Sequence, residues 1–197
     1  MGIPFEQRNF QKELDKKIAG FQKEGIVPTL LLHSCCAPCS SHCIEYLSDY
    51  FHITVFYYNP NISAEEEYRK RVEEQKRFIS EFPAKYKVSF IEGDYDTKEF
   101  YDIAKGYEQC REGGERCFRC YELRLRESAE LAKERGIDTG SVLIITSDFH
   151  MPRAKYIAGK LGMTPYGLTS DTWPWILKVN YQLREVFAFV KAWWKAR

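Results

Sequence analysis

The chain has 197 residues, of which 44% are hydrophobic and 29% charged, and its formal net charge at pH 7 is +1. This composition is that of a soluble globular protein and excludes a chain that is disordered throughout. The charge balance does not require a nucleic-acid partner, and no apolar run approaches the roughly 20 residues of a membrane span. We also expect no signal peptide, because the start, MGIPFEQRNFQKELDKK, has no apolar core.

Helices and strands are predicted to alternate along the chain. A first helix is expected over 7–24, where apolar residues recur at helical spacing. Short apolar runs predict strands at 26–34, 52–60, 87–95 and 141–146. Further helices are predicted over 39–50, 63–82, 97–105, 118–135, 151–161 and 179–195. Ser63 and Glu66 have the spacing of a capping box for the helix 63–82.

This order of elements predicts an α/β fold with a doubly wound parallel sheet and right-handed crossovers. In such sheets the functional site lies at the carboxyl ends of the strands. A cysteine cluster at 35–43 directly follows the first predicted strand. We therefore expect the chemistry of the protein at this edge of the sheet.

The seven cysteines are the most informative residues, and all lie between positions 35 and 120. An odd number without a secretory signal argues against a disulfide scaffold. Cys35 and Cys36 are adjacent at a predicted strand-to-helix turn, where a helix N-terminus is expected to lower thiol pKa values and favour thiolates. Cys117 and Cys120 form a C-x-x-C pair at the start of a later helix. Four thiolates suit an iron–sulfur cluster or structural zinc, and the adjacent pair favours the cluster, with a dithiol redox pair as a third alternative.

The remaining cysteines and the nearby histidine have simpler interpretations. Cys39 makes a second C-x-x-C with Cys36 but also begins a helix, so its role stays open. Cys43 is expected in the core, and Cys110 is expected to be a surface thiol without a function. His33 is expected to be a core histidine with satisfied hydrogen bonds.

Other polar residues gather near the same predicted loops. Asn59 and Asn61 end the second strand, where an ordinary turn is the alternative reading. Arg69 lies on the next helix, most of whose charges are expected to face solvent. Asp94 follows the third strand. The most basic stretch, suited to binding phosphates or simply to a solvated face, contains Arg111, Arg116, Arg119, Arg124 and Arg126.

Five motifs together resemble the epoxyqueuosine reductases of the QueH type, over residues of about 8–140. They are HSCCAPCS, FYYNPNI, EYRKR, EGDY and CFRCYELRL. The resemblance implies a Rossmann-like fold of the adenine nucleotide alpha-hydrolase type. It also implies a cytoplasmic oxidoreductase, with a 4Fe-4S cluster on Cys35, Cys36, Cys117 and Cys120. Cys39 stands where many members of the family carry an aspartate close to the metal, so it is a secondary ligand candidate.

The reaction implied by this resemblance is reduction of the epoxide of epoxyqueuosine in tRNA to queuosine. Two electrons and two protons would convert the epoxide to an alkene and water, and an additional iron acting as a Lewis acid is a second candidate cofactor. Asp94, Tyr58 and Tyr68 are the candidate proton donors. Asn59, Asn61, Arg69 and Arg119 are the candidate substrate-binding residues. The expected partner is a tRNA that presents its wobble base splayed from the anticodon loop, while the electron donor stays unidentified.

After Gly140 the sequence departs from this pattern. The family usually ends with a Cys-Gly-Cys thought to form a redox-active disulfide, and here no cysteine follows Cys120. We therefore expect reduced activity. The alternative is a non-catalytic, zinc- or cluster-stabilised chimeric module that has lost its activity together with the Cys-Gly-Cys.

Residues 141–197 resemble instead the C-terminal part of the YdcF/SanA/ElyC envelope-protein family. In that family the positions matching Asp148, His150 and Arg153 line a polar pocket, but the first half of that family is missing here. We predict two segments, a QueH-like iron–sulfur α/β domain over 1–140 and a divergent strand–helix–helix segment over 141–197, packed on the same sheet.

Overall fold

The computed structural model describes residues 10–111, 114–137, 140–147, 155, 158–159 and 162–170. The chain divides into two compact units. One, the sheet unit, is Gly25–Asp138, and the other, the terminal unit, combines Met1–Glu24 with Thr139–Arg197. In the described part of the chain, no helix has both the length and the apolar character needed to cross a membrane.

The sheet unit is built on three parallel strands, β1 (Thr29–His33), β2 (His52–Tyr57) and β3 (Val88–Glu92), in the order β1-β2-β3. Thr29 pairs with His52 and Ile53 pairs with Val88, so all three strands end at the same edge. The predicted α/β class with a parallel sheet is confirmed. The finer assignment, a fold of the adenine nucleotide alpha-hydrolase type, stays a prediction.

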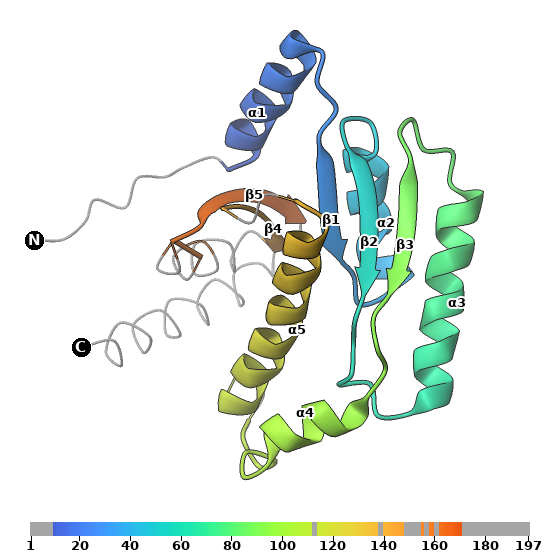
Figure 1. The fold of residues 1–197 in the computed structure, drawn as a ribbon, viewed down its shortest axis with the longest axis vertical. Coiled ribbons are helices and arrows are strands. Elements are labelled where there is room, and N and C mark those ends of the chain that lie inside the picture. Colours follow the sequence, from blue (N-terminus) through green and yellow to red (C-terminus); the bar gives the residue numbers. More distant parts are fainter. Residues whose placement is uncertain are drawn as a thin grey trace, which may run out of the picture. The chain divides into compact units, whose positions relative to one another are not determined.

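Four helices accompany these strands: α2 (Ala37–Leu47), α3 (Glu65–Glu81), α4 (Thr97–Ala104) and α5 (Glu115–Glu134). Helix α2 contacts α3, α3 contacts β3, and α5 contacts both α4 and β1. Figure 1 shows α2 behind the strands, and α5 running in the direction opposite to theirs. The start of α5 therefore lies beyond the carboxyl ends of the strands.

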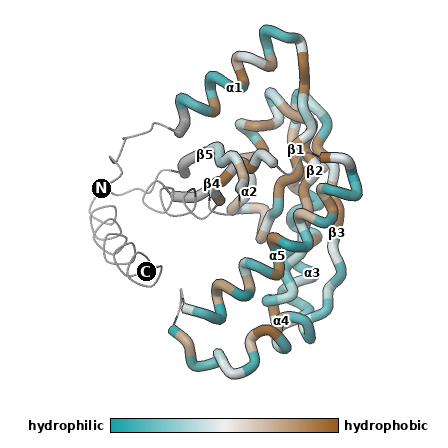
Figure 2. The backbone as a smooth tube through the Cα atoms, turned by 60° about the vertical axis from the view of Figure 1, so that its left-hand side comes forward, coloured by the Kyte–Doolittle hydropathy of each residue, from teal (hydrophilic) through white to brown (hydrophobic). Residues whose placement is uncertain are grey.

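The core of the sheet unit lies between the strands and the helices α2 and α3. Figure 2 shows hydrophobic residues along β1 and β3, whereas α3 is largely hydrophilic along its length. Alternate residues of β2, Ile53, Val55 and Tyr57, are almost fully buried, as a strand with a period of two requires. Helix α3 contributes Tyr68 and Val72, which pack with Tyr57 in one cluster.

The starts of α3 and α5 differ from the prediction. The expected capping box is wrong, because α3 begins at Glu65 without a side-chain cap and the Ser63 hydroxyl instead accepts a hydrogen bond from Tyr101 (2.8 Å). Three glutamates in the first turn of α3 offset the missing cap, because negative charge is favourable at a helix N-terminus. Helix α5 begins at Glu115, which places Cys117 and Cys120 inside its first two turns.

The terminal unit contains α1 (Phe10–Glu24) and two parallel strands, β4 (Ser141–Ser147) and β5 (Thr164–Ser170). Helix α1 contacts β5, and Lys155 Nζ lies 3.3 Å from Glu13 Oε2. Strand β5 was not predicted. Within the described residues β4 pairs with β5 in a sheet of its own, so the packing of 141–197 on the first sheet stays a prediction. Asp148, His150, Arg153 and the predicted helix 179–195 lie outside the described residues.

Candidate metal centre

Three thiols converge at the carboxyl end of β1. Cys35 and Cys36 follow the strand, and Cys36 has extended backbone (φ −172°, ψ 160°) immediately before α2. Pro38 lies in the first turn of α2, where its missing N–H does no harm. This abrupt change from strand to helix brings Cys39 back towards Cys36. Residues 35–39 are called the thiol loop below.

The spacing of these sulfurs suits a metal. Cys36 Sγ lies 2.9 Å from Cys39 Sγ and 3.9 Å from Cys35 Sγ, and all three sulfurs lie within 4.8 Å of one another. Cys35 and Cys39 are exposed and Cys36 is half-buried, so an ion can reach them. Around a tetrahedral zinc with bonds of about 2.3 Å, sulfur atoms are about 3.8 Å apart. The Cys35–Cys36 separation matches this value, whereas Cys36 and Cys39 lie closer together, so the three thiols fit a thiolate-bound metal centre when the Cys39 sulfur moves away from Cys36.

Without a metal, the pKa values of the Cys35 and Cys39 thiols are raised above the ordinary value for cysteine. Burial raises the pKa of the Cys35 thiol. The hydrogen bond with Cys36, followed by burial, raises the pKa of Cys39 to about 12. The lowering expected from the helix N-terminus is wrong for Cys35, because burial, followed by the neighbouring Cys36 thiol, raises its pKa instead. A cation among the sulfurs reverses this balance, because it stabilises thiolates directly.

A buried polar network holds the thiol loop from below. The hydroxyls of Ser34 and Ser40 lie 3.3 and 3.1 Å from the Cys36 carbonyl oxygen, and each lies 3.0 Å from Gln75 Oε1 on α3. Asn59 Nδ2 donates to the Ser34 carbonyl (2.9 Å) and so ties the end of β2 to the end of β1. All four network side chains are at least 94% buried. The loop is therefore fixed by the protein before any metal binds.

Gln75 is the centre of this network. A hydroxyl carries one proton, so Ser34 and Ser40 cannot each donate fully to both Gln75 and the Cys36 carbonyl. All four of these contacts become hydrogen bonds when the amide nitrogen of Gln75 donates to both serine oxygens and each serine hydroxyl donates to the Cys36 carbonyl. In either orientation of the amide, its other polar atom has no hydrogen-bond partner among the described residues.

The second cysteine pair lies on α5. Cys120 is buried and Cys117 is half-buried, and burial raises the pKa of Cys120. Arg124 lies close enough to His33, the last residue of β1, to lower the pKa of that imidazole, although burial is the larger cause. Cys120 precedes Arg124 by four residues, or about 6 Å of helix, which places it beyond the strand end. The structure therefore brings both cysteine groups to one end of the sheet, but the 4.8 Å group does not include Cys117 or Cys120.

Comparison with known proteins agrees with these features. A family model described as "Epoxyqueuosine reductase QueH" matches residues 30–167. This match covers more than half of the chain and includes both cysteine groups. The chain belongs to the QueH family.

Individual relatives support the same assignment. Epoxyqueuosine reductase QueH of Streptococcus pyogenes serotype M1 is 38% identical over 137 residues, 68% of this chain and 54% of the relative. The Staphylococcus epidermidis protein of the same name is 40% identical over 134 residues (66% and 56%), and the Haemophilus influenzae protein is 44% identical over 108 residues (54% and 42%). The chain spans about half the length of the curated relatives it matches.

The QueH match also bears on the predicted departure from the family pattern after Gly140. It continues past residues 139–141, through β4, and ends within β5. The resemblance of 141–197 to the YdcF/SanA/ElyC family therefore stays a prediction, as do the two predicted segments.

Two of the three predicted proton donors are engaged within the protein. The Tyr58 hydroxyl donates to Glu99 Oε2 at 2.5 Å, and burial together with this carboxylate raises the pKa of Tyr58. Tyr68 is fully buried, its hydroxyl lies 3.5 Å from the Gly93 carbonyl, and burial raises its pKa to about 12. Asp94 is exposed just after β3, at the carboxyl edge of the sheet. Only Asp94 of the three is open to solvent.

The two predicted asparagines occupy the turn after β2. Asn59 is buried and serves the network beneath the thiol loop. Asn61 is half-buried, and its Oδ1 has no hydrogen-bond partner among the described residues. Asn59 therefore has a structural role here, and Asn61 keeps a free acceptor.

The two predicted arginines are partly engaged. Arg69 Nη1 lies 2.9 Å from Glu92 Oε1, and its side chain is more than half exposed. Arg119 Nη2 donates to the Tyr107 hydroxyl (3.0 Å), and its guanidinium lies 4.3 Å from the centre of that ring. Both retain exposed surface, so their role in substrate binding stays a prediction.

Of two further predictions near the site, the one for Cys43 is confirmed, and the one for His33 holds in part, because His33 has a hydrogen-bond partner but is half-buried. Cys43 is buried in the core, 6% exposed. The Nε2 atom of His33 lies 2.9 Å from the Tyr58 carbonyl, which only accepts, so the imidazole donates there. Neither residue is open to a substrate in the way that Cys35 and Cys39 are.

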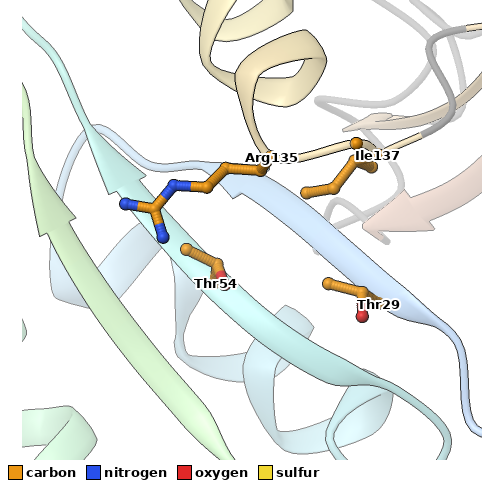
Figure 3. A pocket seen from close by; sticks show the side chains of 5 residues that line it. Thr29, Thr54, Arg135 and Ile137 are labelled. Carbon is orange, nitrogen blue, oxygen red and sulfur yellow. The ribbon is translucent and has the colours of Figure 1, made fainter.

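A cavity of about 480 Å³ lies away from the thiols. Thr29, Thr54, Arg135, Gly136 and Ile137 line it. Figure 3 shows Arg135, at the end of α5, reaching over the strands on the face opposite α2. Because Thr29 begins β1 and the cysteines follow its other end, this cavity is not part of the metal centre.

Sequence reasoning missed Gln75, Ser34 and Ser40. One signal was available for Gln75, because it lies three and seven residues after Val72 and Tyr68 and so shares their buried helix face. A polar residue at a core position of an amphipathic helix implies a buried partner. That the partners are two serines flanking the cysteines follows only from the packing of α3 against α2.

Proposed function

We propose that this chain is the metal-binding part of an epoxyqueuosine reductase, an oxidoreductase that converts epoxyqueuosine in tRNA to queuosine. The observation that carries the proposal is the set of three converging thiols in a chain of the QueH family. The curated relatives bear the name of this activity. We place the protein in the cytoplasm, with a tRNA as its partner and an electron donor that is not identified here.

The proposed cofactor is a 4Fe-4S cluster held by Cys35, Cys36, Cys117 and Cys120. Thiolates are the usual ligands of such clusters. The start of α5 lies at the same end of the sheet as the thiol loop, which supports a shared site. Cys39, within 4.8 Å of Cys35 and Cys36, is the proposed ligand of an additional iron.

In the proposed reaction, two electrons and two protons reach the epoxide, the two C–O bonds break, an alkene forms and the oxygen leaves as water. A bound cluster supplies electrons one at a time. Asp94 is the preferred proton donor, because it is exposed at the carboxyl edge of the sheet while Tyr58 and Tyr68 are buried. Asn61, Arg69 and Arg119 are the proposed contacts to the tRNA, since arginine guanidinium groups bind phosphate oxygens.

Metal content and turnover test this proposal together. After anaerobic reconstitution with iron and sulfide, we expect close to four of each per chain and reduction of epoxyqueuosine tRNA by a chemical reductant. Cys36→Ala is expected to lose both properties, whereas Cys110→Ala, a matched change at a thiol outside the proposed ligand set, is expected to keep both. Full activity in Cys36→Ala would refute the proposed cofactor.

A second candidate function is a zinc-stabilised module without catalysis. The observation that favours it is the tight sulfur spacing in the thiol loop, which suits ligands of one ion. Zinc bound at one per chain, without inorganic sulfide and without turnover after iron–sulfide reconstitution, would establish this alternative.

A further inference from the structure

Tyr57 carries a hydroxyl that the protein itself does not satisfy. It is the last residue of β2 and is fully buried. Its ring packs against Tyr68 and Phe90, with ring centres 5.4 and 6.2 Å away. Its oxygen has no hydrogen-bond partner among the described residues. A buried hydroxyl in this condition lowers stability, so its presence calls for a partner in another state of the protein.

Two hydrogen bonds place Tyr57 beside the base of the thiol loop. The Ser34 N–H donates to the carbonyl of Phe56, the residue before Tyr57 (3.0 Å). Two residues after Tyr57, Asn59 donates to the Ser34 carbonyl (2.9 Å). Tyr57 therefore stands between the two anchors that hold the residue preceding Cys35.

The electrostatic surroundings make the Tyr57 hydroxyl a hydrogen-bond donor. Burial raises the pKa of Tyr57; Arg71 opposes the rise, and Tyr68, Cys35 and Cys36 add smaller increases. The phenol therefore keeps its proton at neutral pH, even beside thiolates. A buried neutral hydroxyl next to developing negative charge stabilises that charge by donating to it.

We propose that Tyr57 is a positioning residue of the metal centre, whose hydroxyl donates a hydrogen bond to an anionic sulfur of the loaded thiol loop. This inference rests on the metal centre in the proposed function and not on the reductase reaction. Hydrogen bonds to metal-bound sulfur orient the ligands and tune the reduction potential. Donation to sulfur offsets negative charge, so it favours the reduced state and makes the potential less negative.

Tyr68 provides a matched control. It belongs to the same buried aromatic cluster, is equally buried, and loses the same single atom in Tyr68→Phe. Its hydroxyl faces the Gly93 carbonyl at 3.5 Å, within the protein. A role confined to packing predicts similar behaviour for the two variants, whereas the proposed role predicts a difference that depends on the metal.

The experiment compares wild type, Tyr57→Phe and Tyr68→Phe in metal-free form and after reconstitution with iron and sulfide. Thermal unfolding is measured in both forms, and the reduction potential and the rate of iron loss to a chelator in the second. Metal-free Tyr57→Phe is expected to unfold at or above the wild-type temperature, because the change removes an unsatisfied polar group. Loaded Tyr57→Phe is expected to lose iron on the order of tenfold faster and to have a more negative potential. Tyr68→Phe is expected to keep the wild-type potential and rate.

Two results would overturn the inference alone. The first is a loaded Tyr57→Phe protein with wild-type potential and iron-loss rate. The second is an equal loss of stability in the metal-free and loaded forms, including failure to fold without metal, which would assign the hydroxyl to the fold or to a buried water. A wild-type chain that takes up no iron would instead refute the metal centre itself, and this inference with it.

Discussion

The two cysteine groups of this chain are held in different ways. In the thiol loop, three sulfurs converge within 4.8 Å, and their backbone is fixed by the buried network around Gln75. Cys117 and Cys120 instead lie on the first turns of α5, a helix 20 residues long that contacts β1 and α4. The position of the second pair therefore depends on the packing of a whole helix.

This difference suggests an order of events at the metal centre. A loop fixed by local hydrogen bonds presents ligands at little entropic cost, so it binds an ion first. A pair on a helix needs the helix to settle on the sheet before it can complete the site. We expect the thiol loop to bind a single ion alone, and the pair on α5 to be needed only for a cluster.

Removing Cys36 is expected to have the largest effect, because this thiol contacts both others in the loop. Cys36→Ala should weaken the binding of one cobalt(II) ion by more than about 100-fold, since losing a direct ligand exceeds the effect of losing a partner of a ligand. The absorption of the thiolate–cobalt bond measures this during titration. Wild-type cobalt(II) affinity in Cys36→Ala would show that the thiol loop is not the site of the single ion, and the contrast with the pair on α5 would fail.

The double variant Cys117→Ala/Cys120→Ala tests whether the pair on α5 is needed for a single ion or only for a cluster. Cobalt(II) affinity is expected to stay within a few-fold of wild type, because the three thiols of the loop lie within 4.8 Å of one another without either cysteine of α5. Uptake of four irons per chain is expected to be lost, because two of the four proposed ligands are gone. Loss of cobalt binding in this variant would mean that the two groups act as one site from the start.

Gln75→Leu tests the support beneath the thiol loop. The change leaves the buried Ser34 and Ser40 hydroxyls with one partner fewer each, so it should lower the free energy of unfolding by about 1–3 kcal/mol. Urea unfolding of the metal-free chain measures the effect. Arg77→Gln, at an exposed position of the same helix, is the control and should change stability by less than about 0.5 kcal/mol. Equal stability of the two variants would show that the network does not hold the loop.

The same contrast explains how much the sequence predicted. Strands β1–β3 were predicted because their apolar runs are local, and Cys35 and Cys36 were placed at the sheet edge because parallel strands end together. Cys39 was already a secondary candidate through its C-x-x-C spacing with Cys36, but the position of Cys117 and Cys120 outside the 4.8 Å group was not predicted. It depends on the position of α5 along its own axis. Tertiary packing determines that position, and the spacing of cysteines in the sequence does not reveal it.

Two further misses have the same physical origin. Strand β5 pairs with β4 through seven residues, but its sequence, TPYGLTS, contains Pro165 and Gly167, which are unfavourable in strands. The capping box failed because Tyr101, 38 residues away in sequence, takes the Ser63 hydroxyl. In both cases a tertiary partner outweighs a local preference.

The smallest effect is expected on α5, where carboxylates repel. Burial raises the pKa of Glu127, and Glu130, Glu99 and Asp94 raise it further. A raised folded-state pKa gives stability that is fully present below the ordinary glutamate range and is lost as the pH rises through the folded value. Glu127→Gln should therefore stabilise the chain at neutral pH, by less than about 1 kcal/mol because the group is partly exposed.

Two features distinguish this effect from a general gain of helix stability. The advantage of Glu127→Gln should vanish in acid, where the wild-type carboxyl is protonated, and should shrink in salt. Glu122→Gln, on the same helix, should instead cost a few tenths of a kcal/mol at neutral pH, because Glu122 pairs with Arg126 at 2.8 Å on the surface. Thermal unfolding at several pH values measures both. A Glu127→Gln advantage that persists in acid would show that carboxylate repulsion does not lower the stability of α5.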